Sequence, residues 1–271
     1  MFEWMEHDLS GLISSRKAPF TIGQIKCYMK QLVDALFMIH QRGLMHRDIK
    51  AANMLLNNSG GLFLADFGLM TSYTGRNKFT NNVITRWYKP PEILLGASNY
   101  GPAVDMWGVG CVLVEMLTGK TPFPGSNEAH QLDLIVKGCG SEEFYAAEEQ
   151  GAQITKLHLF PSAMNRIRAK FPNSRKSNLR AMFQQHKFPE EVMSLLERLL
   201  TVDPALRITA EEVLDHDFFW HGEPPLPESE MPVYPSIHEY ELKQMRSSNG
   251  NSNVKKGHYV VDLPGSSARV V

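Results

Sequence analysis

The chain has 271 residues, of which 43% are hydrophobic, so it is long enough to bury a substantial core. Its formal net charge of −1 at pH 7 gives no sign of general attraction to nucleic acid or to an anionic membrane. The most apolar run, Met106–Leu117, is shorter than the ~20 residues that span a bilayer, and Glu115 interrupts it, so we expect a soluble intracellular protein. The cysteines Cys27, Cys111 and Cys139 have neither paired nor metal-ligand spacing, which favours free thiols in a reducing compartment.

A long helix is predicted to begin at Thr21, because Thr21 and Gln24 have the spacing of a capping box. Apolar residues at helical spacing follow, and Gly43 ends the pattern. Two short apolar runs, Met54–Leu56 and Leu62–Ala65, flank a polar turn and predict a small β-hairpin.

The segment from Met70 to Val83 has no strong periodicity, so we predict a mobile loop there. Asp105–Thr118 is apolar on nearly every face, which predicts a fully buried helix. The spacing of apolar residues in Val192–Leu200 predicts an amphipathic helix, and a capping motif at Thr209 opens another. From Pro224 onward the chain is Pro-rich and then polar, which is typical of an extended or disordered tail.

The segment Arg166–Arg180 is basic and irregular, and it permits two interpretations. The first is a solvated insert, and the second is a docking surface. The sequence has no internal repeats, and its globular part is predicted to be mainly helical with very little strand.

Two short motifs flank the predicted hairpin. The run His46–Asn53 reads His-Arg-Asp-Ile-Lys-Ala-Ala-Asn and precedes it, while Asp66–Gly68 reads Asp-Phe-Gly and follows its second strand. Each motif alone could arise by chance, but their order and placement match the catalytic loop and the metal-binding loop of protein kinases. If both aspartates were only solvated loop carboxylates, the lysine and asparagine at the matching offsets would have no explanation.

The chemistry of phosphoryl transfer assigns a role to each polar residue of these motifs, because it requires a positioned acceptor hydroxyl and neutralised charge on the transferred group. Asp48 would accept a hydrogen bond from the substrate hydroxyl and take its proton, and Lys50 would counter the charge of the phosphate. Asn53 and Asp66 would supply the oxygen ligands that Mg²⁺ prefers, so the expected cofactors are ATP and Mg²⁺. His46 is expected to be structural.

Further downstream, the run Trp87–Glu92 resembles the end of a kinase activation segment. Arg207 stands where kinases place the arginine that pairs with this glutamate, so we expect a structural ion pair between Glu92 and Arg207. Asp105 matches the start of the central buried helix of the kinase C-terminal lobe, and we expect it to cap backbone groups of the catalytic loop.

Residues 1–220 resemble the transcriptional cyclin-dependent protein kinases, through the hinge-like run Phe2–Leu9, the run Phe79–Thr85 and the run Trp87–Glu92. The likeness is greatest to the catalytic subunit of the RNA polymerase II C-terminal-domain kinase, and His238–Lys243 in the tail supports it. The resemblance implies a nuclear, proline-directed serine/threonine kinase with a cyclin partner. It also implies the RNA polymerase II C-terminal repeat as substrate, without direct contact to nucleic acid or membrane.

The resemblance also implies the residues of the nucleotide site. Glu3 and Met5 would offer backbone groups to adenine, and Leu55 would lie beneath the base. Thr85 would join Asp48 and Lys50 in the catalytic group.

The same resemblance implies how the activation segment works. Thr80 would be the activating phosphorylation site, and Arg47 would bind its phosphate. Thr71 stands where relatives have a second phosphate-binding arginine, so we expect a smaller gain on phosphorylation. Val83 and Ile84 would line the pocket for the proline that follows the target residue.

The sequence departs from the kinase pattern in several places. It begins at the hinge-like run and shows no Gly-rich phosphate loop, no third-strand lysine and no glutamate-bearing helix. We therefore expect a mainly α fold. Residues 1–220 would form a partial kinase domain, namely a C-terminal lobe with one short β-hairpin and without the N-terminal β lobe. Residues 221–271 would form a tail. Such a chain is expected to be inactive in isolation, and the alternative to an enzyme is a truncated, non-catalytic interaction protein resembling a pseudokinase. Arg86 replaces the usual leucine, and Lys89 replaces the usual arginine.

Overall fold

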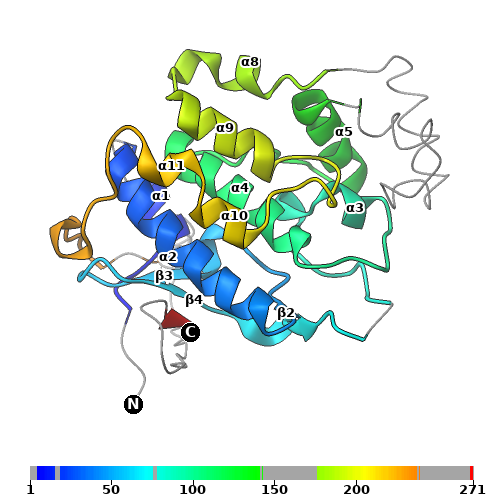
Figure 1. The fold of residues 1–271 in the computed structure, drawn as a ribbon, viewed down its shortest axis with the longest axis horizontal. Coiled ribbons are helices and arrows are strands. Elements are labelled where there is room, and N and C mark those ends of the chain that lie inside the picture. Colours follow the sequence, from blue (N-terminus) through cyan, green and yellow to red (C-terminus); the bar gives the residue numbers. More distant parts are fainter. Residues whose placement is uncertain are drawn as a thin grey trace, which may run out of the picture.

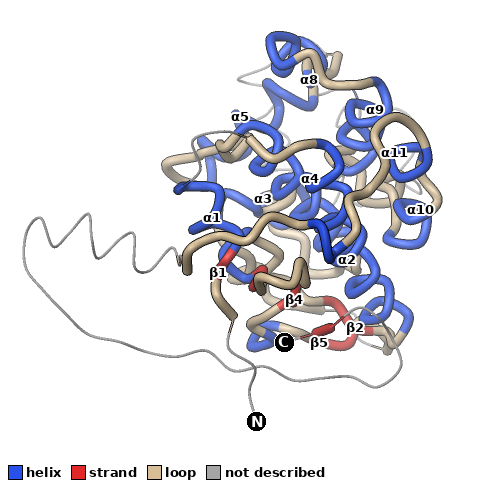
Figure 2. The backbone as a smooth tube through the Cα atoms, turned by 90° about the vertical axis from the view of Figure 1, so that its left-hand side faces the viewer, coloured by secondary structure: helices blue, strands red, loops and turns tan. Residues whose placement is uncertain are grey.

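The computed structural model describes residues 5–15, 19–75, 78–140, 142, 176–236 and 238, together with the backbone of residues 269 and 270. In this part of the chain the helices form one body, and the short strands gather at one end of it (Figures 1 and 2). The helices are α1 (Leu9–Ser15), α2 (Ile22–Gln41), α3 (Pro91–Leu94), α4 (Ala103–Thr118), α5 (Glu128–Cys139), α8 (Leu179–Phe183), α9 (Glu190–Leu199), α10 (Ala210–Leu214) and α11 (Asp217–Trp220). Within the described residues, no helix is both long and apolar enough to cross a bilayer.

Helix α2 begins and ends where the sequence predicts. The Thr21 hydroxyl accepts a hydrogen bond from the Gln24 N–H (3.2 Å), and the Gln24 side chain accepts one from the Thr21 N–H (3.1 Å), so the capping box is confirmed. Beyond the last turn, Gly43 has a φ of 71° and donates its N–H to the His40 carbonyl. The helix packs against α4 and α10, and its apolar face contributes to the main core.

Helix α4 is the buried centre of the protein, because each of its residues from Val104 to Leu117 is buried, as predicted. The helix ends at Gly119, whose φ of 72° is a conformation that glycine adopts without strain. Gly108 allows close packing: a Cβ at this position would lie 2.7 Å from the Cβ of Ile49. Helix α4 therefore lies directly against the loop 46–53.

The strands are more numerous than the predicted single hairpin. The hairpin itself is confirmed as an antiparallel pair, but the described residues form a four-stranded sheet in the order β1-β3-β4-β6 and a two-stranded sheet β2-β5. The strands are β1 (His7–Asp8), β2 (Leu44–Met45), β3 (Met54–Leu56), β4 (Leu62–Leu64), β5 (Thr71–Ser72) and β6 (Arg269–Val270). The expectation of one hairpin is therefore wrong, because two-residue strands are too short to show an alternating pattern in the sequence.

The segment 221–236 forms a strap that runs from α11 along α2 to the β3–β4 turn (Figure 1). The side chain of Lys26 is fully buried, and its Nζ donates to the carbonyl oxygens of His221 and Glu223, both at 2.6 Å. At the far end, Asn58 and Tyr234 exchange two hydrogen bonds of 3.0 and 3.1 Å. A buried ammonium requires such acceptors, so the strap and the helix stabilise each other. The division of the chain at residue 220 stays a prediction.

Glu92 and Arg207 form the buried ion pair that the sequence predicts. The guanidinium makes two hydrogen bonds to the carboxylate, at 2.8 and 2.9 Å, and both side chains are almost inaccessible to solvent. Arg207 also donates to the Ala103 carbonyl and lies over the ring of Trp107. The pair therefore fixes α3, at the end of the activation-segment-like run, to the start of α4.

Asp105 holds the loop 46–53 through its backbone, as predicted. Its carboxylate accepts hydrogen bonds from the N–H groups of His46 and Arg47, both at 2.8 Å, and from the ring of His40 at 2.9 Å. Arg47 has a φ of 68°, which is uncommon for a residue other than glycine, so these bonds stabilise a costly backbone conformation. Burial by itself raises the pKa of Asp105, but the hydrogen bond and charge of His40, the electrostatic interaction with His46 and the Arg47 N–H outweigh burial and hold the pKa below its ordinary value.

We predict that Asp105→Asn lowers the free energy of unfolding by about 2–3 kcal/mol, because an amide has one acceptor oxygen and leaves a buried N–H group unpaired. Urea denaturation followed by circular dichroism measures the change. Asp34→Asn is the matched control: Asp34 makes an exposed pair with Lys30 on α2, and its loss is expected to cost less than about 0.5 kcal/mol. Equal losses in the two variants would contradict the role of Asp105.

Candidate active site

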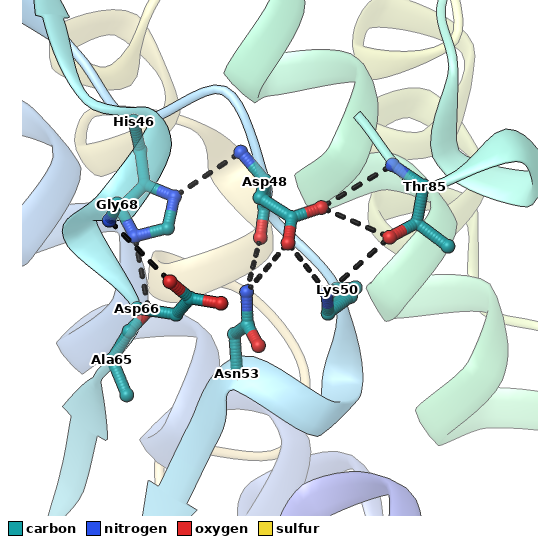
Figure 3. A network of polar contacts seen from close by, with 8 residues as sticks. All are labelled: His46, Asp48, Lys50, Asn53, Ala65, Asp66, Gly68 and Thr85. Carbon is teal, nitrogen blue, oxygen red and sulfur yellow. Dashed lines mark hydrogen bonds and ion pairs between the residues drawn. The ribbon is translucent and has the colours of Figure 1, made fainter. Parts of the chain in front are cut away.

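Asp48 is the centre of a hydrogen-bonded network (Figure 3). It lies in the loop between β2 and the 3₁₀ helix η1 (Ala51–Asn53) and is 5% exposed. One carboxylate oxygen accepts hydrogen bonds from Lys50 Nζ (2.5 Å) and Asn53 Nδ2 (3.0 Å). The other accepts from the N–H (3.2 Å) and the hydroxyl (3.0 Å) of Thr85. The structure therefore brings together Asp48, Lys50, Asn53 and Thr85, which the sequence analysis named from separate segments.

The surroundings of Asp48 keep its carboxylate ionised. Burial alone raises the pKa of Asp48, but the hydrogen bond and charge of Lys50, together with the Thr85 bonds, outweigh burial and hold the pKa below its ordinary value. The four donors also fix the orientation of the carboxylate. Such a group is a fixed acceptor that can orient a hydroxyl, rather than a strong base.

His46 links the two motifs through its ring. Its Nδ1 accepts a hydrogen bond from the Asp48 N–H (3.2 Å), and its Nε2 donates to the Ala65 carbonyl (3.1 Å). Burial lowers the pKa of His46, which agrees with a neutral ring that accepts at one nitrogen and donates at the other. These contacts support the structural role that the sequence analysis expects.

Asn53 and Asp66 present oxygen atoms suited to a magnesium ion. The Asn53 amide nitrogen donates to the Asp48 carbonyl (2.8 Å) and carboxylate, so its oxygen is turned away from Asp48. Asp66 is exposed and in a left-handed conformation with φ 64°, and in Figure 3 its carboxylate points toward Asn53. The described residues contain no cluster of three His, Cys, Asp or Glu side chains that could hold a metal. Two protein ligands nevertheless fit Mg²⁺, which commonly takes one or two carboxylate ligands plus phosphate oxygens.

The residues expected to contact adenine are only partly described. Met5 and Leu55 are both buried and pack together with Phe63 in a small apolar cluster beside β3 and β4. Glu3 lies outside the described residues, so the structure does not place it. The structure therefore joins Met5 to Leu55, and their role toward adenine stays a prediction.

Thr80 is exposed, and its backbone is connected to Arg47 through Tyr100. The Tyr100 hydroxyl donates to the Thr80 carbonyl (2.6 Å) and accepts a hydrogen bond from Arg47 Nη1 (3.2 Å). Arg47 also donates to the Leu69 carbonyl (2.7 Å). Thr71 lies in β5 and pairs with Met45 of β2, and Met45 precedes Arg47 by two residues. Phosphorylation of Thr80, binding of its phosphate by Arg47 and the effect of Thr71 stay predictions.

Ile84 has a strained backbone next to the Asp48 network. Its φ is 66°, a conformation that is an outlier for a β-branched side chain. Val83 and Ile84 are both buried, and the next residue, Thr85, holds Asp48. Strain of this kind often marks a functional segment, and here it falls on the pair expected to receive proline.

Sequence reasoning missed two residues that support the site. His40 holds the Asp105 carboxylate from α2, and Tyr100 connects Arg47 to the Thr80 backbone. Neither belongs to the motifs that identify the site. Only the packing of α2 and of the loop before α4 brings them to the catalytic loop.

Comparison with known proteins identifies the family. The model of the protein kinase domain matches residues 1–219. Cyclin-dependent kinase 9 of Xenopus tropicalis is 35% identical over 281 residues, which cover 99% of this chain and 68% of the relative. The chain belongs to the cyclin-dependent serine/threonine protein kinases.

The prediction of a C-terminal lobe alone, with the β lobe absent, is wrong, since the domain match begins at residue 1 and strands β1 to β5 form an N-lobe-like β region.

Other relatives of this kinase agree on the family. Cyclin-dependent kinase C-1 of Oryza sativa subsp. japonica is 43% identical over 248 residues, which cover 91% of this chain and 46% of the relative. A crystal structure of the yeast RNA Pol II CTD kinase CTDK-1 complex matches with a TM-score of 0.76 and 35% identity, covering 84% of this chain and 72% of the other. The CAK complex of Chaetomium thermophilum bound to ATP-gamma-S matches with a TM-score of 0.74 and 32% identity, covering 86% and 70% of the two chains. This kinase covers 46% of the C-1 kinase of Oryza sativa subsp. japonica and 47% of that of Arabidopsis thaliana, so it spans about half the length of these two relatives.

We predict that Lys50→Met raises the pKa of Asp48 relative to the wild type, because burial is then opposed only by the Thr85 hydrogen bonds, without the charge and hydrogen bond of Lys50. NMR titration of the Asp48 side-chain carboxyl carbon measures the shift without requiring turnover. In the wild type, the stabilisation from this depressed pKa is present above the unfolded-state value and is lost as pH falls through the folded-state value. Lys30→Met removes an exposed, remote cation and serves as the control. An unchanged titration in Lys50→Met would contradict this assignment.

Proposed function

We propose that this kinase transfers the γ-phosphate of ATP to a serine or threonine that is followed by proline, and that the RNA polymerase II C-terminal repeat is its substrate. We further propose that it works in the nucleus with a cyclin. The observation that carries the catalytic part is the network around Asp48, in which Lys50, Asn53 and Thr85 all donate to one buried carboxylate. The similarity to the yeast RNA Pol II CTD kinase complex supports the proposed substrate, and the similarity to cyclin-dependent kinases supports the proposed cyclin partner.

In this proposal the residues of the chain position the acceptor hydroxyl. Asp48, ionised and fixed by its donors, accepts the hydrogen bond of the substrate hydroxyl and receives its proton as the oxygen becomes bonded to phosphorus. Lys50 lies beside the same carboxylate and offsets the negative charge of the transferred group. Asn53 and Asp66 would hold Mg²⁺ on ATP. ATP would supply the phosphoryl group, and Mg²⁺ would neutralise part of its charge.

The arrangement favours an enzyme over a non-catalytic interaction protein. A protein that only binds partners has no need for four converging donors on one carboxylate, or for Thr85 to reach Asp48 from a segment 37 residues away. The expectation that the isolated chain is inactive stays a prediction, because the match to the protein kinase domain over residues 1–219 does not test activity. Catalysis is therefore the function that the geometry supports best.

We predict that Asp48→Asn and Asp66→Asn separate turnover from nucleotide binding. Asp48→Asn should reduce kcat by about 10³-fold or more while nearly preserving the Kd of Mg·ATP, because Asp48 acts on the acceptor hydroxyl. Asp66→Asn should weaken Mg·ATP binding as well as turnover, because an amide replaces a charged metal ligand. Peptide phosphorylation with the full chain and its cyclin measures kcat, and calorimetry measures the Kd.

Asp34→Asn, a remote substitution on α2, is the control for general effects of losing a carboxylate. Equal losses of Mg·ATP affinity in Asp48→Asn and Asp66→Asn would show that the two roles are assigned wrongly. Full turnover in Asp48→Asn would sink the proposed enzyme mechanism.

We explain the proposed proline preference by the left-handed backbone conformation of Ile84, the residue directly before Thr85. The positive φ of Ile84 turns the adjoining peptide groups relative to an extended chain, and we infer that this removes a backbone acceptor from the position after the target residue. Proline, which has no N–H, needs no acceptor there, whereas any other residue would leave its N–H unpaired. The buried side chains of Val83 and Ile84 supply an apolar surface for the ring.

We predict that a Ser-Pro peptide has a kcat/KM about 10–100-fold higher than the matched Ser-Ala peptide, which corresponds to one unpaired N–H group. Replacing the alanine by N-methylalanine, which also lacks the N–H, should recover most of the difference. Comparison of kcat/KM for the three peptides checks the prediction. If N-methylalanine behaves like alanine, the preference depends on the shape of the ring and not on the missing donor.

A further inference from the structure

Arg86 is an exposed cation directly beside the Asp48 network. It follows Thr85 in the chain and begins the 3₁₀ helix η3 (Arg86–Tyr88). Its Nη1 donates to the carbonyl of Ser126 (2.8 Å), in the loop before α5. The next residue, Trp87, is 45% exposed and donates its Nε1 to the carbonyl of Gly125 (3.1 Å). Two neighbouring side chains thus reach the same loop and remain open to solvent.

The loop that receives these side chains is itself held in place. The Gly125 N–H donates to the Gln131 side-chain oxygen (2.9 Å), and the Gln131 amide nitrogen donates to the Trp87 carbonyl (3.1 Å). The Ser126 N–H donates to His130 Nδ1 (3.2 Å). An arginine anchored in this way loses little further conformational freedom when it binds a ligand.

The charge of Arg86 is not neutralised within the described residues. The guanidinium carries five N–H donors, and the Ser126 carbonyl is its one hydrogen-bond acceptor in that part of the chain. Glu128, the acid at the start of α5, instead pairs with Lys89 Nζ at 2.5 Å. The fork of the guanidinium is therefore available to an external anion.

The position of Arg86 relative to the acceptor site identifies which part of a peptide it faces; this step rests on the proposed function. In the proposed complex the target hydroxyl lies at Asp48, and the proline after it lies over Val83 and Ile84, on one side of Thr85. The peptide segment before the target residue then extends to the other side of Thr85, where Arg86 lies. In an extended peptide, side chains two residues apart point to the same face and are about 6.6 Å apart. The side chain two residues before the target thus faces the enzyme near Arg86.

We propose that Arg86 is a specificity-determining residue that binds an anionic side chain two residues before the target serine or threonine. The shared chemistry is a planar carboxylate or a phosphate, either of which the arginine fork can bind with two parallel hydrogen bonds. A phosphorylated residue carries more charge than a carboxylate and is the stronger ligand. The enzyme would then favour peptides that are acidic, or already phosphorylated, on the amino-terminal side of the target.

Direct binding of fluorescent Ser-Pro peptides to the full chain tests the proposal, with phosphorylation of the same peptides measured in parallel. Phosphoserine two residues before the target should bind about tenfold more tightly than alanine, and glutamate about threefold, as expected for charge-assisted hydrogen bonds. Arg86→Leu should abolish both preferences, and Arg86→Glu should favour a peptide with arginine at that position. Arg86→Lys, which keeps the charge without the fork, should retain part of the glutamate preference and less of the phosphoserine preference.

Arg198→Leu is the matched control, because Arg198 lies on α9 and pairs with Glu212 away from the site. It should keep both preferences, and moving the acidic residue to three positions after the target should remove them. Unchanged preferences in Arg86→Leu, or equal gains from acids at both positions, would overturn the proposal. If the preference is found but no phosphate is transferred, the proposed enzyme fails while the binding site stands. If phosphate is transferred without the preference, the binding site alone is wrong.

Discussion

The buried carboxylate of Asp105 is the contact on which the catalytic geometry depends. It comes from the most buried helix of the described structure and accepts the N–H groups of two successive loop residues, His46 and Arg47. One of these residues has a positive φ, so the loop would relax without the carboxylate. Gly108, one turn further along the helix, lets Ile49 pack closely against it. Asp48 lies between these two attachments, and its direction is therefore set by the core.

A balance of charge and burial then gives Asp48 its chemical character. Burial opposes ionisation, while Lys50 and Thr85 favour it more strongly, and the result is an ionised and oriented acceptor. The neutral ring of His46 joins this loop to the loop of Asp66 through the Ala65 carbonyl. The spacing between the proposed base and the proposed metal ligands is thus held by hydrogen bonds rather than by sequence distance.

The segment proposed to face the substrate, residues 83–92, is also held by buried contacts that position its exposed groups. The Glu92–Arg207 ion pair fixes the end of the segment to the core, and removal of one partner would leave an uncompensated buried charge. Before this anchor, Ile84 is held in a strained conformation and Arg86 is tied to the loop before α5. Rigid support of this kind lowers the entropic cost of ordering a peptide, which connects the fold to the proposed selectivity.

The sequence by itself determined the features that depend on local patterns. The capping box of Thr21, the buried helix α4, the β3–β4 hairpin and the pairing of Glu92 with Arg207 all follow from spacing or from family motifs, as do the residues that surround Asp48. The tertiary structure alone decided the remaining strands, the strap held by Lys26, and the positions of His40 and Tyr100. These depend on contacts between segments far apart in the chain, and two-residue strands or single hydrogen-bonding side chains leave no periodic signal. Long-range packing therefore completed a site whose chemistry was already visible in its motifs.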